Sequence, residues 1–372
     1  MARNRTIYNV MALYVSSGTA TGTTTGLVGA DIPRQLSRVQ NFDEDFTRNF
    51  TDVNQFGNLA AIDRIEVENP DVTASFSYYL TNGQNERELG LNVHGTGTVE
   101  SALRSCISGL LSKATDEKNY YLSIVDEGQD AAGYVGANTG VIGVGNGFLT
   151  SYTVNAAVGD IPTAEVAIEG LNLRVYTTSS GIIPAVNPEN GTNFTDKFFR
   201  LPAATSITGL IGNTTIPTAL QPGDITFSLT SDQVLGFNGT DLKVQDFSLS
   251  FDLARTPLRK LGSRFAFSRE IDFPVTATLE VNAEVGDLAT GNLSDLLCGE
   301  TNKNFTISMK SPGCGTNRST ALAYLFKGAK LVSQSFSSAI GDNATMTASY
   351  EVQLGGVQDT TNGVFISGNI AP

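Results

Sequence analysis

One stretch of this chain occurs twice, and that repeat constrains the fold more than any other feature. The segment Arg38–Leu80 returns in degenerate form from Lys243 to Val285 at one constant offset of 205 residues. The identical pairs along this offset include Val39 and Val244, Gln40 and Gln245, Phe42 and Phe247, Phe46 and Phe251, Gly57 and Gly262, and Arg64 and Arg269. A duplicated supersecondary unit must form the same elements in both copies, so the sequence predicts two related halves.

Later segments recur in the same order, at an offset that falls to 182. NYYLSIV (119–125) is matched by NFTISMK (304–310), and AVGDIPTAEVAIEGLNL (157–173) by AIGDNATMTASYEVQL (339–354). The first copy therefore carries insertions, which we place in its glycine-rich segment 128–147. The predicted organisation is a domain over 1–172, a Pro-, Asn- and Thr-rich linker or pair of long loops over 173–220, and a second domain over 221–372.

Composition and periodicity favour strands over helices in both copies. Charged residues make up 16% of the chain, against about 25% in an ordinary soluble protein, and Ser, Thr, Asn and Gly replace them. Apolar residues recur at helical spacing over Val99–Lys113, with Leu103, Ile107, Leu110 and Leu111 on one face, and GNLSDLLCGE (291–300) matches this segment. The predicted fold is mainly β: two tandem β-sandwich or barrel-like domains, each with one flanking α-helix.

The strand Val39–Phe46 alternates strictly in character. Asn41, Asp43 and Asp45 point to one side, and Phe42 and Phe46 to the other, because successive side chains of a strand face opposite ways. Unpaired carboxylates are costly to bury, so the acidic side is predicted to be solvated and the aromatic side to face the core.

Motifs for enzyme chemistry are lacking in the sequence. There is one histidine, His94, and there are three cysteines without a CxxC pair; GVGNG (143–147) lacks the Lys-Ser/Thr of a phosphate-binding loop. No apolar run reaches the roughly 18 residues that span a bilayer. We therefore expect no enzyme, no cofactor, no metal site and no membrane partner. The net charge of -13 also argues against tight binding to DNA phosphates.

A family resemblance lies in VQNFDEDFTRNFTDVNQFGNLAAIDRIEVENPDVTASFSYYL and in the later AVGDIPTAEVAIEGLNL. With its arginine-flanked hairpin, Val-Asn-Gln-Phe-Gly turn and Tyr-Tyr-Leu end, the first segment resembles tail tube proteins of long-tailed bacteriophages. The second is similar to the end of that domain. The resemblance covers roughly 1–172 and, more weakly, 221–372, whereas 178–222 has no match.

The resemblance implies a structural protein of the virion tail, present in the host cytoplasm during assembly. Tail tube subunits form rings that stack into a tube, first filled by a tape-measure protein and later crossed by the genome. Two fused domains imply a homotrimeric ring with pseudo-sixfold symmetry, which also contacts other tail proteins. Asn41, Asp43 and Asp45 are then expected to face the lumen. The polar segment 51–61 is expected to dock on a neighbouring subunit through Asp52, Asn54, Gln55, Phe56 and Leu59.

Two other functions are compatible with the sequence. A tail-terminator or neck protein of related fold would also be a ring-forming virion part. A β-rich adhesin would fit the Thr- and Asn-rich composition, but adhesins usually display aromatic residues in exposed loops. This chain has no tryptophan, and its aromatic residues lie mainly in alternating strands.

Overall fold

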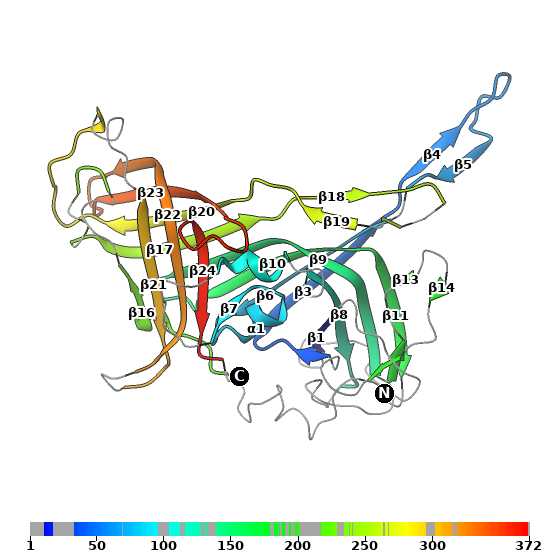
Figure 1. Ribbon diagram of the computed structural model, residues 1–372, viewed down its shortest axis with the longest axis horizontal. Helices are drawn as coiled ribbons and strands as arrows, with labels where there is room; N and C mark the ends of the chain where they lie inside the picture. Colours follow the sequence, from blue (N-terminus) through cyan, green and yellow to red (C-terminus); the bar gives the residue numbers. More distant parts are fainter. Residues whose placement is uncertain are drawn as a thin grey trace.

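The computed structural model is mainly β, built almost entirely from antiparallel strands (Figure 1). The residues that the structure describes are 11–17, 33–68, 70–95, 104–111, 116–127, 131, 139–178, 182–184, 186, 188–189, 193–194, 198–200, 217–228, 234–237, 239, 241–262, 265–266, 268–294, 302–314 and 318–370.

The first half of the chain contributes β1 (Met11–Ser17), β2 (Arg34–Gln35), β3 (Val39–Thr47), β4 (Phe50–Val53), β5 (Asp63–Glu66), β6 (Asp71–Tyr79), α1 (Gln84–Glu88), β7 (Val93–His94), η2 (Cys106–Gly109), β8 (Glu117–Ile124), β9 (Thr139–Ala157), β10 (Thr163–Gly170) and β11 (Asn172–Thr178). Short strands follow as β12 (Ile182–Pro184), β13 (Pro188–Glu189), β14 (Asn193–Phe194) and β15 (Phe198–Arg200). The second half contributes η4 (Pro222–Asp224), β16 (Ile225–Phe227), β17 (Lys243–Asp252), β18 (Arg255–Leu258), β19 (Ser268–Ile271), β20 (Thr276–Glu284), β21 (Lys303–Lys310), β22 (Thr320–Ser337), β23 (Thr345–Gln353) and β24 (Gly363–Gly368).

The repeated stretch pairs its strands in the same register in both copies. In the first copy β3 pairs with β6, Phe46 lying opposite Val72; in the second β17 pairs with β20, Phe251 lying opposite Ala277. Each pair has a bulge at the equivalent glutamine, Gln40 or Gln245. The hairpins β4–β5 and β18–β19 also match at the offset of 205. The strand pattern predicted for Arg38–Leu80 and its echo is therefore confirmed.

The later strands repeat with the same fidelity. β9–β10 and β22–β23 share their pairing at the offset of 182, with a bulge after Ala167–Ser151 in one and after Ser349–Ser333 in the other. The Asn119 side chain accepts a hydrogen bond from the backbone N of Asn146, and Asn304 accepts one from Gly328. Both donors have a positive φ, 51° and 75°. A bulge that needs a left-handed residue has thus persisted in both copies.

The main insertion of the first copy lies between β6 and β8. Up to β6 and β20, paired strands of the two copies match at an offset of 205 residues. The offset falls to 185 residues between Asn119 of β8 and Asn304 of β21, and to 182 residues between β9 and β22. The prediction that the insertion lies in 128–147 was therefore wrong, because only three of the inserted residues fall between β8 and β9. The larger insertion contains α1 and β7, for which the described residues of the second copy show no counterpart.

The helix predicted over 99–113 is wrong within its described part, 104–111, where the chain forms only the 3-10 turn η2. The Cys106 carbonyl accepts a hydrogen bond from the Asn92 backbone at 2.7 Å. A Cβ on Gly109 would lie 2.2 Å from the Gly90 oxygen, so the segment lies directly against backbone. Ile107 and Leu110 are nevertheless buried as predicted, whereas Leu103 falls outside the described residues. In the second candidate, residues 295–300 also fall outside them.

Two segments expected to be loops contain strands. β9 begins at Thr139, inside the glycine-rich segment, because its glycines make room for neighbours: a Cβ on Gly145 would lie 2.5 Å from the Val186 oxygen. β11 begins at Asn172, at the edge of the expected linker 173–220, and pairs with β9. Part of that linker therefore packs on the first copy, with Ile183 and Val186 buried.

In each copy one long strand divides its pairing between two sets of neighbouring strands. The first half of β9 pairs with β8 and β11, and its second half pairs with β10 and β17. In the same way, the first half of β22 pairs with β21 and β24, and its second half pairs with β23. A single hydrophobic cluster contains core residues of both copies, including Phe76, Tyr152, Phe251 and Tyr350. The boundaries at 172 and 221 stay a prediction.

Candidate assembly surfaces

One face of a continuous eight-stranded sheet is solvated. Its strands run in the order β3, β6, β10, β9, β17, β20, β23, β22, so both copies contribute to it. Alternate residues face the core and are buried, as in the patterns of β6 and β23. The carboxylates on the opposite, solvated face are Asp43, Asp45, Asp71, Glu165, Glu169, Asp246, Asp252, Glu280, Glu284 and Glu351. The basic residues on these strands that share this face are Lys243 and Lys330.

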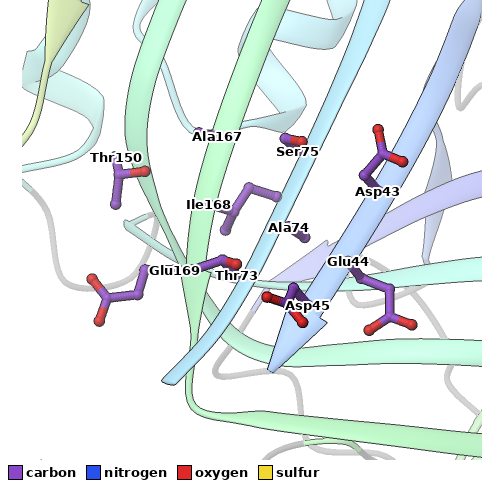
Figure 2. A pocket seen from close by; sticks show the side chains of 10 residues that line it. All are labelled: Asp43, Glu44, Asp45, Thr73, Ala74, Ser75, Thr150, Ala167, Ile168 and Glu169. Carbon is purple, nitrogen blue, oxygen red and sulfur yellow. The ribbon is translucent and has the colours of Figure 1, made fainter. Parts of the chain in front are cut away.

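The structure places Asn41, Asp43 and Asp45 on this solvated face, as the alternation predicts. Asn41 accepts a hydrogen bond from the Ser77 backbone at 2.6 Å, and Asp43 and Asp45 lie opposite Ser75 and Thr73. Both carboxylates are exposed. They border an open hollow of about 330 Å³ (Figure 2), which is lined by Asp43, Glu44, Asp45, Thr73, Ala74, Ser75, Thr150, Ala167, Ile168 and Glu169. The hollow is acidic, so it repels anions.

The two copies join edge to edge through β9 and β17. Val154 lies opposite Leu249 and Tyr152 opposite Phe251, whose rings are 5.5 Å apart. Backbone hydrogen bonds from Val158 to Gln245 and from Leu253 to Thr150 extend the pairing at both ends. β17 is the counterpart of β3, and β9 the counterpart of β22. The joint is therefore head to tail, between two different edges of the repeated unit.

The hairpin β18–β19 reinforces this joint with two ion pairs to the first copy. The Arg255 guanidinium donates to both Asp116 oxygens, at 2.7 and 2.9 Å, and stacks over the Phe148 ring at 5.0 Å. Arg269 lies 2.6 Å from Glu169. Burial raises the pKa of Asp116, and the hydrogen bonds from Arg255 act against that shift. The geometry is bidentate and shielded, which makes this pair stronger than an exposed one.

The equivalent hairpin, β4–β5, extends away from the body of the molecule (Figure 1). Of the residues expected to contact a neighbour, Asp52 pairs with Arg64 at 3.1 Å and Gln55 accepts a turn hydrogen bond from Asn58. Asn54 is exposed, and Phe56 and Leu59 are fully exposed at the tip. Leu261 is the counterpart of Phe56 and is also fully exposed, each preceding a glycine of positive φ. Their contact with a neighbour stays a prediction.

Sequence reasoning missed a buried polar cluster where the two copies meet. Glu86 of α1 is fully buried, and its Oε1 accepts hydrogen bonds from Tyr78 at 2.9 Å and Tyr152 at 3.1 Å. The Tyr152 hydroxyl also lies 2.8 Å from that of Tyr324 in β22. Burial raises the pKa of Glu86, while the two tyrosine hydrogen bonds lower it. No motif signals this cluster, because Gln84–Glu88 reads as a polar loop.

Among the described residues, no three His, Cys, Asp or Glu side chains are grouped to hold a metal ion. His94 lies in the short strand β7, which pairs with β24. Within the same described part of the chain, no helix has the length and apolar character to cross a membrane.

Comparison with known proteins gave little similarity. No protein family model matches the chain, and no curated protein matches it. A chain in the solved structure described as "Cryo-EM structure of the anti-feeding prophage (AFP) baseplate, 6-fold symmetrised" is 13% identical, with a TM-score of 0.24. That match covers 40% of this chain and 93% of the other.

Proposed function

We propose that this protein is a structural subunit of a phage tail tube, located in the virion tail and present in the host cytoplasm during assembly. Three copies close into a ring, the rings stack, and the solvated face of the eight-stranded sheet lines the channel. The observation that carries the proposal is the continuity of that face across both copies. The sequence resemblance of Arg38–Leu80 and 157–173 to tail tube proteins supports the same function.

The dimensions of the proposed ring suit its role. Three chains bring 24 strands of this face; at a spacing of about 4.8 Å and a tilt of about 40°, they enclose a backbone diameter of ~48 Å. Such a channel has room for inward side chains and a DNA duplex. Closing the ring also removes the exposed strand edges, which otherwise promote aggregation.

The charge of the face explains how the channel would serve the genome. DNA binds proteins mainly through Lys and Arg contacts to phosphate. The proposed lining presents many carboxylates and only Lys243 and Lys330 as basic residues. DNA is therefore held centrally and slides without binding, and the same channel first holds the tape-measure protein.

Electron microscopy of the purified full chain tests the proposal directly. We expect rings of three subunits that stack into hollow tubes as concentration increases. Discrete rings that never stack would favour a tail-terminator or neck protein instead. A protein that stays monomeric at all concentrations, and also in the presence of the other tail proteins, would refute the ring.

A further inference from the structure

Two sheet edges of the chain have no partner strand among the described residues, while their counterparts in the other copy are paired. As strands, β3 pairs only with β6, and the second half of β22 pairs only with β23. Side chains of this part of β22 contact the segment 234–237, where Gln334 hydrogen-bonds to the Leu235 backbone and Phe336 stacks on Phe237. Their counterparts, β17 and the second half of β9, bond to each other. The two free edges are thus equivalent to the two strands of the β9–β17 joint, which the chain already forms once internally.

We propose that β3 of one copy pairs antiparallel with the end of β22 of a second copy, in the register of the β9–β17 joint. Transferring that register by the two offsets places Asn41 opposite Ala339, Asp43 opposite Ser337, Asp45 opposite Ser335 and Thr47 opposite Ser333. This inference deepens the proposed function and rests on it, since it specifies the contact that closes the ring.

The exposure of side chains along the two edges supports the pairing. Phe46 is 54% exposed, whereas its counterpart Phe251 in the internal joint is 2% exposed. Phe336 is 55% exposed, whereas its counterpart Val154 is fully buried. Large apolar side chains at both free edges thus occupy positions that become core when the joint forms.

Side chains beyond the edges complete the match. The internal joint holds Arg269 against Glu169 at 2.6 Å, and the corresponding residues are Arg64 and Glu351. Both are exposed in the chain, where Arg64 pairs with the exposed Asp52 and stacks over Phe50. The pairing brings Arg64 of one copy to Glu351 of the second.

A second contact keeps its chemistry although its residues are exchanged. In the internal joint the Arg255 guanidinium lies over the Phe148 ring at 5.0 Å. The corresponding residues are Phe50 and Lys330, so the cation and the ring have changed sides. A cation–π contact between Phe50 and Lys330 of the second copy is therefore expected at the same place.

Charge also selects this partner edge over the alternative of pairing β3 with β3. Two β3 strands would set Asp43, Glu44 and Asp45 against the same carboxylates, which is destabilising for directly opposed residues. The segment Lys330–Ser337 contains one lysine and no carboxylate. The acidic edge therefore fits the β22 edge and not itself.

Cysteine cross-linking tests the register. Hydrogen bonds at Val158–Gln245 and Leu253–Thr150 place Ser248 and Asn155 in a non-hydrogen-bonded pair, whose Cα atoms lie about 4.5 Å apart. Their counterparts Asp43 and Ser337 suit a disulfide. In a background with Cys298 and Cys314 replaced by serine, Asp43→Cys with Ser337→Cys should form intermolecular disulfides on mild oxidation. Asp43→Cys with Ser333→Cys, offset by about 13 Å, should not.

Charge exchange tests the side-chain contact. Arg64→Glu or Glu351→Arg alone should reduce the assembled fraction at least tenfold by sedimentation, and the double variant should restore it. Arg48→Glu combined with Glu351→Arg is the matched control, at an exposed arginine between β3 and β4, and should show no restoration.

The outcomes separate this inference from the tube itself. Rings or tubes that form without the Asp43–Ser337 cross-link and without charge rescue would overturn the inference and leave the proposed function standing. Cross-linked open chains that never close would support the inference and contradict the ring. Cross-linking of the offset pair in place of the matched one would overturn the register.

Discussion

At the residue scale, Glu86 shows what the pattern of a sequence cannot reveal. Its neighbours are polar, and the described residues of the second copy hold no counterpart of the insertion that contains it, so neither periodicity nor the repeat marks it. The structure buries the carboxyl between Tyr78 and Tyr152, and Oε2 has no hydrogen-bond partner among the described residues. By contrast, alternation correctly predicted that Asp43 and Asp45 lie on the solvated face, because a strand has a period of two. The prediction that Phe46 is buried in the core was wrong for the single chain, where Phe46 is 54% exposed at the edge of the sheet.

Glu86 should make the protein less stable as pH rises. Its pKa is raised in the fold, so its favourable contribution is complete below its unfolded pKa of about 4.3 and is lost as pH rises through the folded pKa. Glu86→Gln removes this ionisation and should lessen the loss of stability between pH 4 and 8. Urea denaturation across that range measures it, with the exposed Glu44→Gln as control. Parallel pH curves for wild type and Glu86→Gln would contradict the assignment.

Arg255 should be among the most costly residues to remove from the joint. Arg255→Ala leaves the half-buried Asp116 without its bidentate partner, a loss of about 3 kcal/mol in the free energy of unfolding. Chemical denaturation of the purified chain measures the change. Arg48→Ala removes a solvent-exposed pair with Glu66 and should change stability little. Equal effects of the two substitutions would show that the buried pair has no special weight.

At the scale of elements, strands could be predicted better than helices. The hairpins and their glycine turns follow from a residue spacing that occurs in both copies of the repeat, and both copies form them. The helix over 99–113 failed because apolar spacing specifies which side chains are buried and not the backbone path; contact with Gly90 and Asn92 decides that path. The start of β9 was missed because its glycines are typical of loops, whereas here they admit Val186.

The β4–β5 hairpin should be needed for stacking and not for folding. Its Phe56 and Leu59 side chains are exposed to solvent, and none of its side chains belongs to the core. Deleting 52–60 should therefore leave thermal stability and rings intact but prevent long tubes. Electron microscopy and circular dichroism measure the two properties. Phe56→Ser with Leu59→Ser, which keeps the turn, should reproduce the defect. Normal tube length in the deletion variant would refute the docking role.

At the scale of the whole molecule, the repeat predicted the sheet better than it predicted separate domains. The order of strands follows from the duplicated segments, but the merging of both copies into one sheet and one core depends on the β9–β17 joint. That joint combines edges that are far apart in the sequence, and no local pattern marks which edges meet. The acidic lining likewise arises only when strands of both copies are placed side by side.

Reversing charge on the proposed lining should slow DNA without disturbing assembly. Asp43→Lys with Asp45→Lys adds phosphate-binding groups on the solvated face, where the residues opposite them in the proposed contact are the neutral Ser337 and Ser335, so tubes should still form. Genome release from particles carrying the variant should be slower, and the delay should shrink at high salt. Asp43→Asn with Asp45→Asn is the matched neutral control and should have a smaller effect. Unchanged release, or carboxylates found on the tube exterior, would contradict the lining.

The β9–β17 joint also changes how ring formation depends on protein concentration. Its two edges belong to one polypeptide, so they meet at the high effective concentration that a tether provides. In the proposed ring every second joint is made during folding, and three contacts between chains remain, the last of which closes within the assembled trimer. The onset of ring formation should then depend on the third power of protein concentration, where six separate single-repeat subunits would give the sixth. Tethering half of the joints would let rings form early in infection, while subunits are still scarce.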